Sequence, residues 1–273
     1  MDDGNGGPGI RDAEGVRIEG ISLSYGCAKI LDGVSLAIRK GSVVTLVGPN
    51  GCGKTTLLKI INRLLKPDSG RVFVDGSDIS KMSTHRLARI MGYVPQGHRT
   101  SFPFTVKEVV ITGRMPYVPA FSTPGKEDIK KTEQVLSLIR IDRLSDHAYT
   151  QISGGERQLV MIARAMVQEP SVLLLDEPTS YLDFRNQIQT LKLIREISKS
   201  RDVTVIMTLH DPNHAMMFSD EVVLLRRLNG NGAGNVVASG SPEDAMTPQN
   251  IKSAYGVEVE IVDVKGRRLL MPI

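Results

Sequence analysis

Residues 48–55 read GPNGCGKT and stand between an apolar, β-branched run at 42–47 (SVVTLV) and a helix-like pattern. The octapeptide fits G-x-x-x-x-G-K-[ST], a loop whose glycines let backbone N–H groups wrap a phosphate at a helix N-terminus. Lys54 is expected to hold the β- and γ-phosphates of a nucleotide, and Thr55 to offer its hydroxyl to Mg²⁺. A glycine turn with an incidental lysine is the alternative, and the flanking patterns argue against it. The residues predicted to contact the nucleotide here are Gly48, Pro49, Asn50, Gly51, Cys52, Gly53, Lys54, Thr55 and Thr56.

The patterns around this loop predict an α/β fold. The helix expected directly after the loop ends at Pro67, and its apolar face consists of Leu57, Leu58, Ile61, Leu64 and Leu65. Further strands are predicted at residues 71–75, 91–94, 171–175, 203–208 and 221–225. The central strands are apolar without alternation, as expected for strands buried on both faces, so the centre of the sheet is predicted to be parallel. Between about residue 97 and residue 170 helical patterns replace the strand signal, which predicts an inserted, mainly helical lobe.

Two carboxylates, Asp176 and Glu177, follow the apolar run at 171–175. A buried strand that ends in Asp176 places this carboxylate at the carboxyl edge of the sheet, where it can hold Mg²⁺ through water. Glu177 is then expected beside the γ-phosphate, where it would orient and polarise the attacking water. Two acids that merely mark a strand end are the alternative, which the phosphate loop makes the weaker interpretation.

A histidine, His210, follows the strand predicted at 203–208. Histidines at strand ends are more often structural residues than ligands. His214 lies four residues later, the spacing of a helical metal pair, but no Glu follows His210 and Pro212 is expected to start a helix between the two histidines. We therefore reject a metal site. A histidine next to the Asp176 strand would instead reach the γ-phosphate and hold the water together with Glu177.

The stretch ISGGE at residues 152–156 is, by itself, a turn. Together with the motifs above, however, the chain resembles the nucleotide-binding subunits of ABC transporters from residue 17 to about residue 258. Seven stretches in the order of that family carry the resemblance: Tyr25 in LSYG, GPNGCGKTT, Gln96 in YVPQ, ISGGERQ, LLLDEP, Asp183 in SYLD, and His210 in TLHD. The resemblance implies the P-loop ABC nucleotide-binding fold, with a mainly parallel core sheet, an N-terminal antiparallel β part and an inserted helical lobe.

The domain limits follow from this fold. We expect a disordered tail at 1–15 and one ABC ATPase domain at 16–273. Its α/β core is expected at 16–96 and 171–273, and its helical lobe at about 97–170. The glycine-rich segment at 229–234 is predicted to be a loose hairpin loop.

The resemblance also implies roles for residues that the loop does not contain. Tyr25 would stack on adenine, and Gln96 would contact Mg²⁺ and the attacking water at the joint of the two lobes. Asp183 would communicate between two ATP sites, because the family works as a head-to-tail dimer. The turn that caps the γ-phosphate bound to a second copy is Ser153, Gly154, Gly155 and Glu156. The implied catalytic residues are Glu177, His210 and Gln96, and the implied Mg²⁺ ligands are Thr55, Gln96 and Asp176.

Residues 105–121 (TVKEVVITGRMPYVPAF) resemble the permease-facing region of importer ATPases for iron chelates, siderophores, haem and cobalamin. The resemblance implies an ATP-hydrolysing subunit that drives uptake of such a chelate. Its expected partners are an identical subunit, transmembrane permease subunits and a separate substrate-binding protein, at the cytoplasmic face of the cell membrane. Changes at Arg114 or Tyr117 are expected to abolish transport and to leave the ATPase of the isolated subunit intact. The alternatives are an importer ATPase for another cargo such as molybdate or tungstate, a non-transport ABC ATPase, and a P-loop phosphotransferase.

Composition limits the other possibilities. The net charge of +4 comes from scattered basic residues, and aromatic residues make up only 4% of the 273 residues, so no nucleic-acid partner is predicted. Cys27 and Cys52 form no CxxC pair, which argues against a disulfide framework or zinc site and fits a reducing compartment. No apolar run approaches the roughly 18 residues of a spanning helix, and the first residues do not form a secretory signal.

The phosphate loop gives a first prediction. Lys54→Ala removes a charge committed to the phosphates, so we expect ATP binding and ATP hydrolysis both to collapse. Cys52→Ala is expected to be mild, because this position contributes mainly its backbone amide. Nucleotide titration and an ATPase assay measure both effects, and near-normal turnover of the lysine variant would contradict the assignment. Cys52 is also expected to be alkylated in the absence of nucleotide and protected by ATP.

Overall fold

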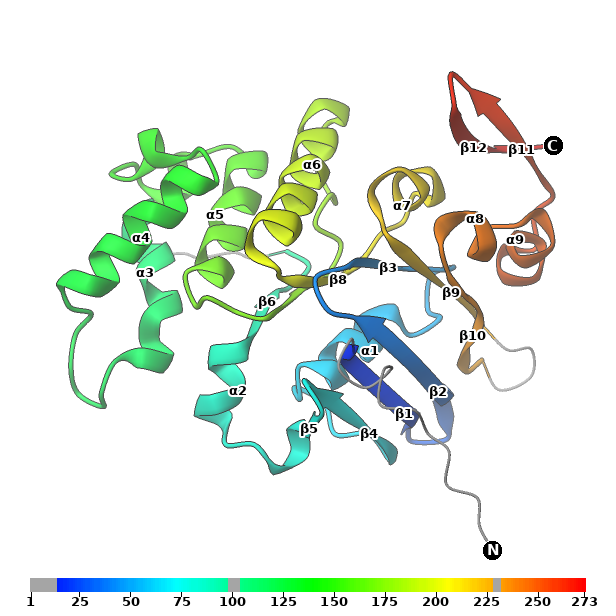
Figure 1. The fold of residues 1–273 in the computed structure, drawn as a ribbon, viewed down its shortest axis with the longest axis horizontal. Coiled ribbons are helices and arrows are strands. Elements are labelled where there is room, and N and C mark those ends of the chain that lie inside the picture. The colour runs from blue at the N-terminus through cyan, green and yellow to red at the C-terminus, as the bar shows by residue number, and fades with distance from the viewer. Residues whose placement is uncertain (1–13, 98–103, 228–231) are drawn as a thin grey trace, which may run out of the picture.

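The computed structural model describes residues 14–97, 104–227 and 232–273 (Figure 1). Its strands are β1 (Glu14–Tyr25), β2 (Ala28–Arg39), β3 (Val43–Val47), β4 (Ser69–Val74), β5 (Ser77–Asp78), β6 (Met91–Val94), β7 (Val172–Leu175), β8 (Thr204–Thr208), β9 (Glu221–Arg227), β10 (Gly234–Gly240), β11 (Val259–Val264) and β12 (Arg267–Pro272). Its α-helices are α1 (Lys54–Ile61), α2 (Thr84–Ile90), α3 (Val106–Ile111), α4 (Lys126–Leu138), α5 (Gly154–Met166), α6 (Phe184–Arg201), α7 (Pro212–Phe218), α8 (Pro242–Ala245) and α9 (Pro248–Tyr255). Short 3₁₀ helices are η2 (Ile79–Lys81), η3 (Thr112–Tyr117), η4 (Asp142–Leu144) and η5 (Tyr149–Gln151).

One large sheet organises the molecule, with the strand order β5-β4-β1-β2-β10-β9-β3-β8-β7-β6. The strands from β9 to β6 pair in parallel. Every residue of β3, β7 and β8 is buried, which explains why their sequences are apolar without alternation. At the other side β1 pairs antiparallel with both β2 and β4. The predicted fold class, a mainly parallel core with an antiparallel β part and added helices, is therefore confirmed.

Two apolar layers cover the central strands. On one face Val43 and Val47 of β3 belong to the cluster that includes α5, α6 and α7. On the other face Val44 and Leu46 belong to the cluster that includes α1 and the antiparallel strands. Alternate residues of one strand thus point to opposite faces, as strand geometry requires. Figure 1 shows α6 and α7 on one side of these strands and α1 on the other.

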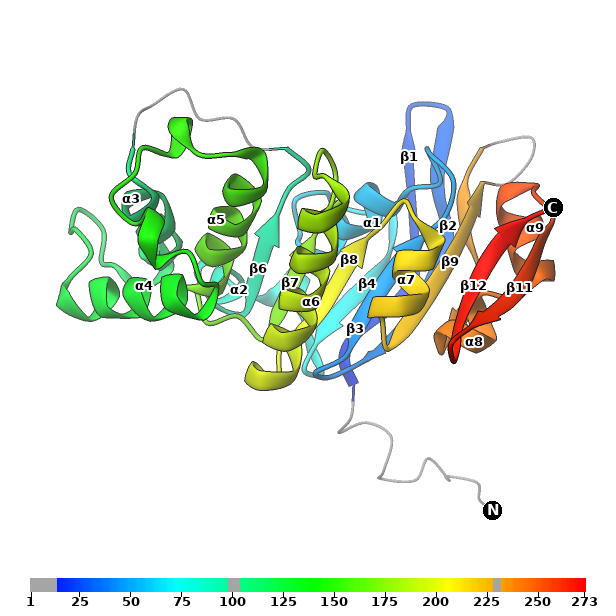
Figure 2. The same cartoon turned by 90° about the horizontal axis from the view of Figure 1, so that it is seen from above.

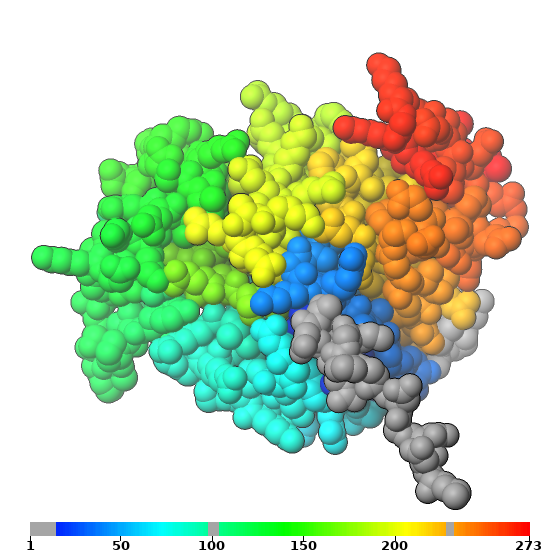
Figure 3. Space-filling view, in the orientation of Figure 1, coloured from blue at the N-terminus to red at the C-terminus, as the bar shows by residue number. Residues whose placement is uncertain are grey.

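Helices α3, α4 and α5 gather beyond β6, and the β11–β12 hairpin lies at the opposite end of the molecule (Figure 2). The same two ends are separate in the space-filling view (Figure 3). These helices lie in the segment where the sequence has no strand pattern, although the limits of the two lobes stay a prediction. Among the described residues, no helix is long and apolar enough to cross a bilayer.

Three local expectations need correction or comment. Helix α1 ends at Ile61, because Arg63 adopts a left-handed conformation (φ 54°) that turns the chain away. Leu64 is consequently 57% exposed and does not extend the apolar helix face. Strand β1 begins at Glu14, inside the segment expected to be a disordered tail. Residues 1–13 of that tail and residues 229–231 of the predicted loop lie outside the described residues.

The end of α1 can be tested by a matched pair of variants. Leu58 is fully buried under the sheet, so Leu58→Ala is expected to lower the free energy of unfolding by about 2–5 kcal/mol. Leu64→Ala removes a largely exposed side chain and should change it by about 0.5 kcal/mol or less. Urea denaturation measures both, and equal losses would mean that α1 continues past Ile61.

Candidate nucleotide-binding site

The phosphate loop lies between β3 and α1. Gly53 is the N-cap of α1 with φ 91°, a left-handed conformation that favours glycine. Because glycine has no side chain to cap the helix, the first N–H groups of α1 stay available for an anion. The Lys54 side chain is buried, and its Nζ donates to the carbonyl oxygens of Gly48 (2.8 Å) and Pro49 (3.1 Å). The loop thus holds a buried ammonium against its own backbone.

Cys52 lies within this loop and is completely buried. Its Sγ is 3.9 Å from Nζ of Lys54, and burial raises the pKa of the thiol despite that nearby charge. A buried thiol with a raised pKa is a poor nucleophile. The expectation that Cys52 is readily alkylated is therefore wrong, because the sequence pattern placed the residue in the loop but did not show which way its side chain points.

Thr55, Asp176 and Thr208 form a small network at the end of the central strands. The Thr55 hydroxyl donates to Oδ1 of Asp176 (2.9 Å), and the Thr208 hydroxyl donates to the same oxygen (2.9 Å). Thr208 also accepts a hydrogen bond from the backbone N–H of Glu177 (2.7 Å). The carboxylate of Asp176 is thus buried and oriented from the neighbouring strand β8 and from α1.

The Glu177 carboxylate is held from three directions. Nε2 of His210 lies 2.5 Å from Oε1, and since a carboxylate only accepts, this nitrogen carries the proton. Oε2 accepts from the amide of Gln96 and from the hydroxyl of Ser180 (2.7 Å). Glu177 itself has φ 50°, an uncommon conformation for a residue with a side chain. The structure therefore brings together the three residues predicted to be catalytic.

The strand register explains this convergence. Val94 pairs with Leu175, and Leu46 pairs with Thr208, so β6, β7, β8 and β3 end at the same edge of the sheet. Gln96, Asp176, His210 and Gly48 follow these strands by one or two residues. Sequence reasoning missed two residues of the site, Thr208 and Ser180. Thr208 is the polar last residue of an apolar strand, and this exception to the pattern is the signal that could have identified it.

An open pocket of about 300 Å³ lies beside the loop and is lined by Tyr25, Ile30, Asn50, Gly51, Gly53, Lys54, Thr55, Thr56 and Glu177. Tyr25 is 53% exposed at the end of β1. An exposed aromatic ring and a buried ammonium that line the same pocket suit a molecule with a flat base and a phosphate tail.

The turn at 153–156 lines a different pocket, of about 550 Å³ between α5 and α6, which it shares with Asp183. Ser153 is the N-cap of α5, and its hydroxyl exchanges hydrogen bonds with Glu156 in a capping box. Hydrogen bonds from Ser153 and then from Arg143 hold the pKa of Glu156 below its usual range. The helix begins at Gly154. A carboxylate therefore stands at this helix end beside the amides predicted to bind phosphate.

Asp183 caps α6 in a similar way, with Oδ1 accepting from the N–H of Asn186 (2.8 Å) and Oδ2 from its side-chain amide (3.0 Å). The side chain of Asn186 also lies against Gly155, so the caps of α5 and α6 are neighbours. Tyr181 is 91% exposed in the intervening turn and has φ 63°, an uncommon conformation for a residue with a side chain. The turn and Asp183 thus line a pocket that shares no residue with the pocket of the phosphate loop.

The donor set fits a magnesium ion. Thr55, Asp176 and Gln96 offer a hydroxyl, a carboxylate and an amide oxygen around the end of β7, and Mg²⁺ prefers such oxygen ligands. Only one of these groups is charged, which is usual where phosphates supply the remaining ligands.

A phosphate loop after β3 and a carboxylate after β7, at the edge of a parallel sheet, define a P-loop nucleotide-binding protein. The chain matches the ABC transporter family model over residues 31–180. It is 39% identical over 256 residues to the uncharacterized ABC transporter ATP-binding protein MJ0089 of Methanocaldococcus jannaschii, covering 94% of this chain and 97% of that protein. It is 35% identical over 260 residues to the ferric enterobactin transport ATP-binding protein FepC of Escherichia coli, covering 94% of both. The chain belongs to the ABC transporter family and is the ATPase subunit of a transporter.

Solved structures agree with this assignment. A transporter described as an inward-facing ABC transporter of metal-chelate type superposes with a TM-score of 0.82 at 26% identity, covering 95% of this chain and 98% of the other. The bacterial ABC transporter cassette MJ0796, solved as a dimer, superposes with a TM-score of 0.70 at 28% identity, covering 83% and 98%.

The role of Thr208 gives a second pair of variants. Thr208→Val keeps the shape but removes hydrogen bonds to Asp176 and to the N–H of Glu177, so we expect the free energy of unfolding to fall by about 1–3 kcal/mol. Thr208→Ser retains the hydroxyl and should recover most of that loss. Chemical denaturation provides the comparison, and equal stability of the valine variant and the wild type would show that this network is not stabilising.

Proposed function

We propose that this chain hydrolyses ATP to energise uptake of a metal chelate through a separate transmembrane permease. The observation that carries the hydrolytic part is the Glu177 carboxylate, which Gln96, His210 and Ser180 hold next to the pocket of the phosphate loop. The similarity to FepC and to the metal-chelate type transporter supports the cargo class.

Nucleotide binding is assigned to the loop and to β1. The N–H groups at the start of α1 and the ammonium of Lys54 would bind the phosphates, with Lys54 exchanging its backbone acceptors for phosphate oxygens. Tyr25 would stack on the base at the other end of the pocket. This division explains why a buried cation and an exposed ring line the same small pocket.

Thr55, Asp176 and Gln96 would hold Mg²⁺, which when bound neutralises charge on the phosphates. Thr208 orients Asp176 for this purpose from the neighbouring strand. The residues of the chain thus provide one charged and two neutral ligands.

Glu177 is assigned to the attacking water. A carboxylate within one hydrogen bond of that water can orient it and accept its proton as the bond to phosphorus forms. His210 donates Nε2–H to Glu177 in the structure, and the same N–H would hold the water or the γ-phosphate. Gln96 donates a hydrogen bond to the other carboxylate oxygen of Glu177. Because α3, the first helix of the helical part, follows Gln96 along the chain, a movement of Gln96 on nucleotide binding would be transmitted to that part.

The turn of Ser153, Gly154, Gly155 and Glu156 would act on the nucleotide of a second copy. Ser153, Gly155, Glu156 and Asp183 line a pocket that includes no residue of the phosphate loop, and the amides of the turn stand at the N-terminus of α5. A head-to-tail homodimer would place this helix end against the γ-phosphate and give two composite sites. Asp183, next to that turn, would link the two sites.

The complete importer would contain two copies of this subunit, permease subunits in the membrane and a separate substrate-binding protein. The subunit would then lie at the cytoplasmic face of the cell membrane. Purification of the tagged chain from membranes of its source would test this arrangement, since a permease should copurify. Uptake of a ferric siderophore and of cobalamin by the purified complex in vesicles would then distinguish the cargoes.

The composite site can be tested without the permease. Glu177→Gln retains the shape but removes the carboxylate that activates water, so we expect turnover to fall by about two to four decades and ATP binding to persist. The variant should form a dimer that depends on ATP, and Ser153→Arg added to it should abolish that dimer. Size-exclusion chromatography with and without ATP is the measurement. A Glu177→Gln protein that binds ATP normally and stays monomeric at saturation would refute the composite site.

A further inference from the structure

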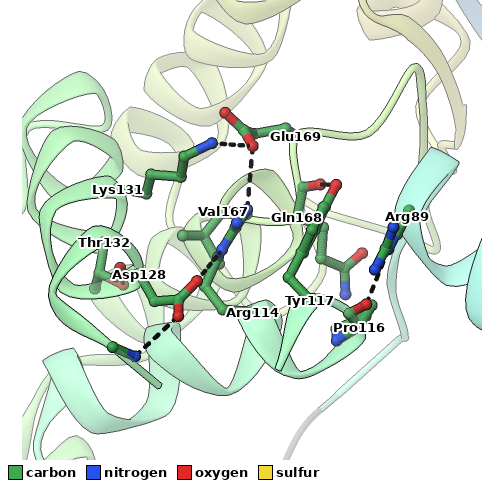
Figure 4. Close-up of polar contacts among 11 residues, drawn as sticks. Arg89, Arg114, Pro116, Tyr117, Asp128, Lys131, Thr132, Val167, Gln168 and Glu169 are labelled. Carbon is green, nitrogen blue, oxygen red and sulfur yellow. Dashed lines mark hydrogen bonds and ion pairs between the residues drawn. The ribbon is translucent and has the colours of Figure 1, made fainter. Parts of the chain in front are cut away.

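Arg114 is a buried cation that the site does not use. It lies in η3 and is only 4% exposed. Its Nε donates to Asp128 at the start of α4 (2.9 Å), and its Nη1 donates to the carbonyl oxygen of Val167 (2.9 Å) and to Glu169 (3.1 Å). Figure 4 shows these groups converging on the guanidinium. Arg114 thus joins three segments: η3, the start of α4 and the chain after α5.

Both acidic partners are themselves anchored. Asp128 accepts a further hydrogen bond from the N–H of Gly125 (2.9 Å), and Glu169 accepts from Nζ of Lys131 (2.6 Å). The hydrogen bond from Arg114 is the main cause that lowers the pKa of Asp128. The pair of Arg114 and Asp128 is largely buried, so removing one member leaves an uncompensated charge, whereas Glu169 is 52% exposed and adds a weaker tie.

Tyr117 extends the cluster towards the α/β core. Its ring centroid lies 3.9 Å from the guanidinium carbon of Arg114 and 4.7 Å from that of Arg89, and Figure 4 shows the ring between the two side chains. Its hydroxyl donates to the carbonyl oxygen of Gln168 (2.8 Å), and Arg89 donates to the carbonyl oxygen of Pro116 (2.9 Å). Arg89 belongs to α2, which leads directly into β6.

The backbone of η3 packs equally closely on α5. A Cβ atom at Gly113 would collide with the carbonyl oxygen of Arg164 and with Val167. The side chain of Arg164 in turn donates to the Thr112 hydroxyl (2.9 Å). No larger residue fits at Gly113 without moving η3 away from the helix. We call the set of Gly113, Arg114, Tyr117, Asp128 and Glu169 the η3 clamp.

The position of the η3 clamp in the chain suggests its role. Val167, Gln168 and Glu169, which it holds, connect the C-terminal end of α5 to β7. Helix α5 begins at the turn after Ser153, and β7 ends at Asp176. Thirteen residues make α5 about 20 Å long, so a tilt of about 5° at the clamped end would displace the Ser153 end by about 2 Å. Such a displacement exceeds what phosphate binding by amides tolerates.

We propose that Arg114 is a positioning residue for ATP hydrolysis, which through the η3 clamp fixes the direction of α5 and hence the reach of the Ser153 turn towards a second copy. This inference rests on the proposed composite site. It corrects the expectation that changes at Arg114 or Tyr117 leave the isolated ATPase intact, because the Arg114 guanidinium is buried and the Tyr117 ring and hydroxyl are engaged in the same cluster. Arginine is required because its planar group serves two carboxylates, a carbonyl and an aromatic face together, which the single ammonium of lysine cannot do.

The test measures nucleotide binding and dimer formation separately in the full-length chain. In the Glu177→Gln background, Arg114→Met should leave the affinity of the monomer for a fluorescent ATP analogue within about twofold, because the phosphate loop does not touch the η3 clamp. Its ATP-dependent dimer should weaken by roughly 10- to 100-fold, and kcat of Arg114→Met alone should fall by a similar factor with KM little changed. Arg114→Lys should recover only part of the loss. Tyr117→Phe, which removes one hydrogen bond, is the milder variant if the methionine variant does not fold.

Lys252→Met is the control, because that ammonium is 63% exposed and pairs with Glu258 at the surface, on α9 at the end of the molecule opposite α5 (Figure 2). It should change neither binding nor dimer formation. Folded Arg114 and Tyr117 variants with an unchanged dimer would overturn the proposal, as would parallel losses of nucleotide affinity and dimer, which would indicate general destabilisation. A Glu177→Gln parent that binds ATP but never dimerises would instead refute the composite site, and the inference with it.

Discussion

The hydrogen bonds that Asp176 accepts from Thr55 and Thr208 tie the chemistry of this protein to its sheet. They join the start of α1, the end of β7 and the end of β8 around one buried carboxylate oxygen. A buried carboxylate is tolerated only when its lone pairs are satisfied, so the start of α1 and the ends of β7 and β8 must lie at the same level. The parallel register aligns the ends of the central strands, and Glu177, Gln96 and His210 contact one another just past those ends.

The second constraint lies in the helical part, where the apolar core is supplemented by a buried guanidinium. An apolar side chain at position 114 would fill space but would not specify direction, whereas the hydrogen bonds of Arg114 fix the angles between η3, α4 and the chain after α5. Surface ion pairs such as Arg140 with Glu196 are exposed to water and contribute little to that geometry. Two buried polar groups therefore fix the directions of the neighbouring segments: the Arg114 guanidinium near the C-terminal end of α5, and the Asp176 carboxylate after β7.

Two helix ends in the structure are used differently. At α1 the cap is Gly53, which leaves the N–H groups free, and the ammonium of Lys54 lies in the same loop. At α5 the cap is Ser153 with Glu156, which satisfies part of the helix end within the chain. The first helix end can thus bind an anion within one chain, whereas a carboxylate of the same chain already occupies part of the second helix end.

Much of this protein was determined by its sequence alone. The phosphate loop, the buried strands and the order of the motifs predict the α/β fold, the ABC family and the residues around Glu177, because backbone geometry and apolar burial act over short stretches of chain. Sequence did not reveal that Leu64 leaves the helix, that Cys52 is enclosed, or that Thr208 holds Asp176. The tertiary structure decided these points, and it also placed Arg114 inside rather than on a docking surface. Whether a polar side chain is buried depends on which distant segments surround it, and Asp128, Val167 and Glu169 reach Arg114 only after the chain has folded.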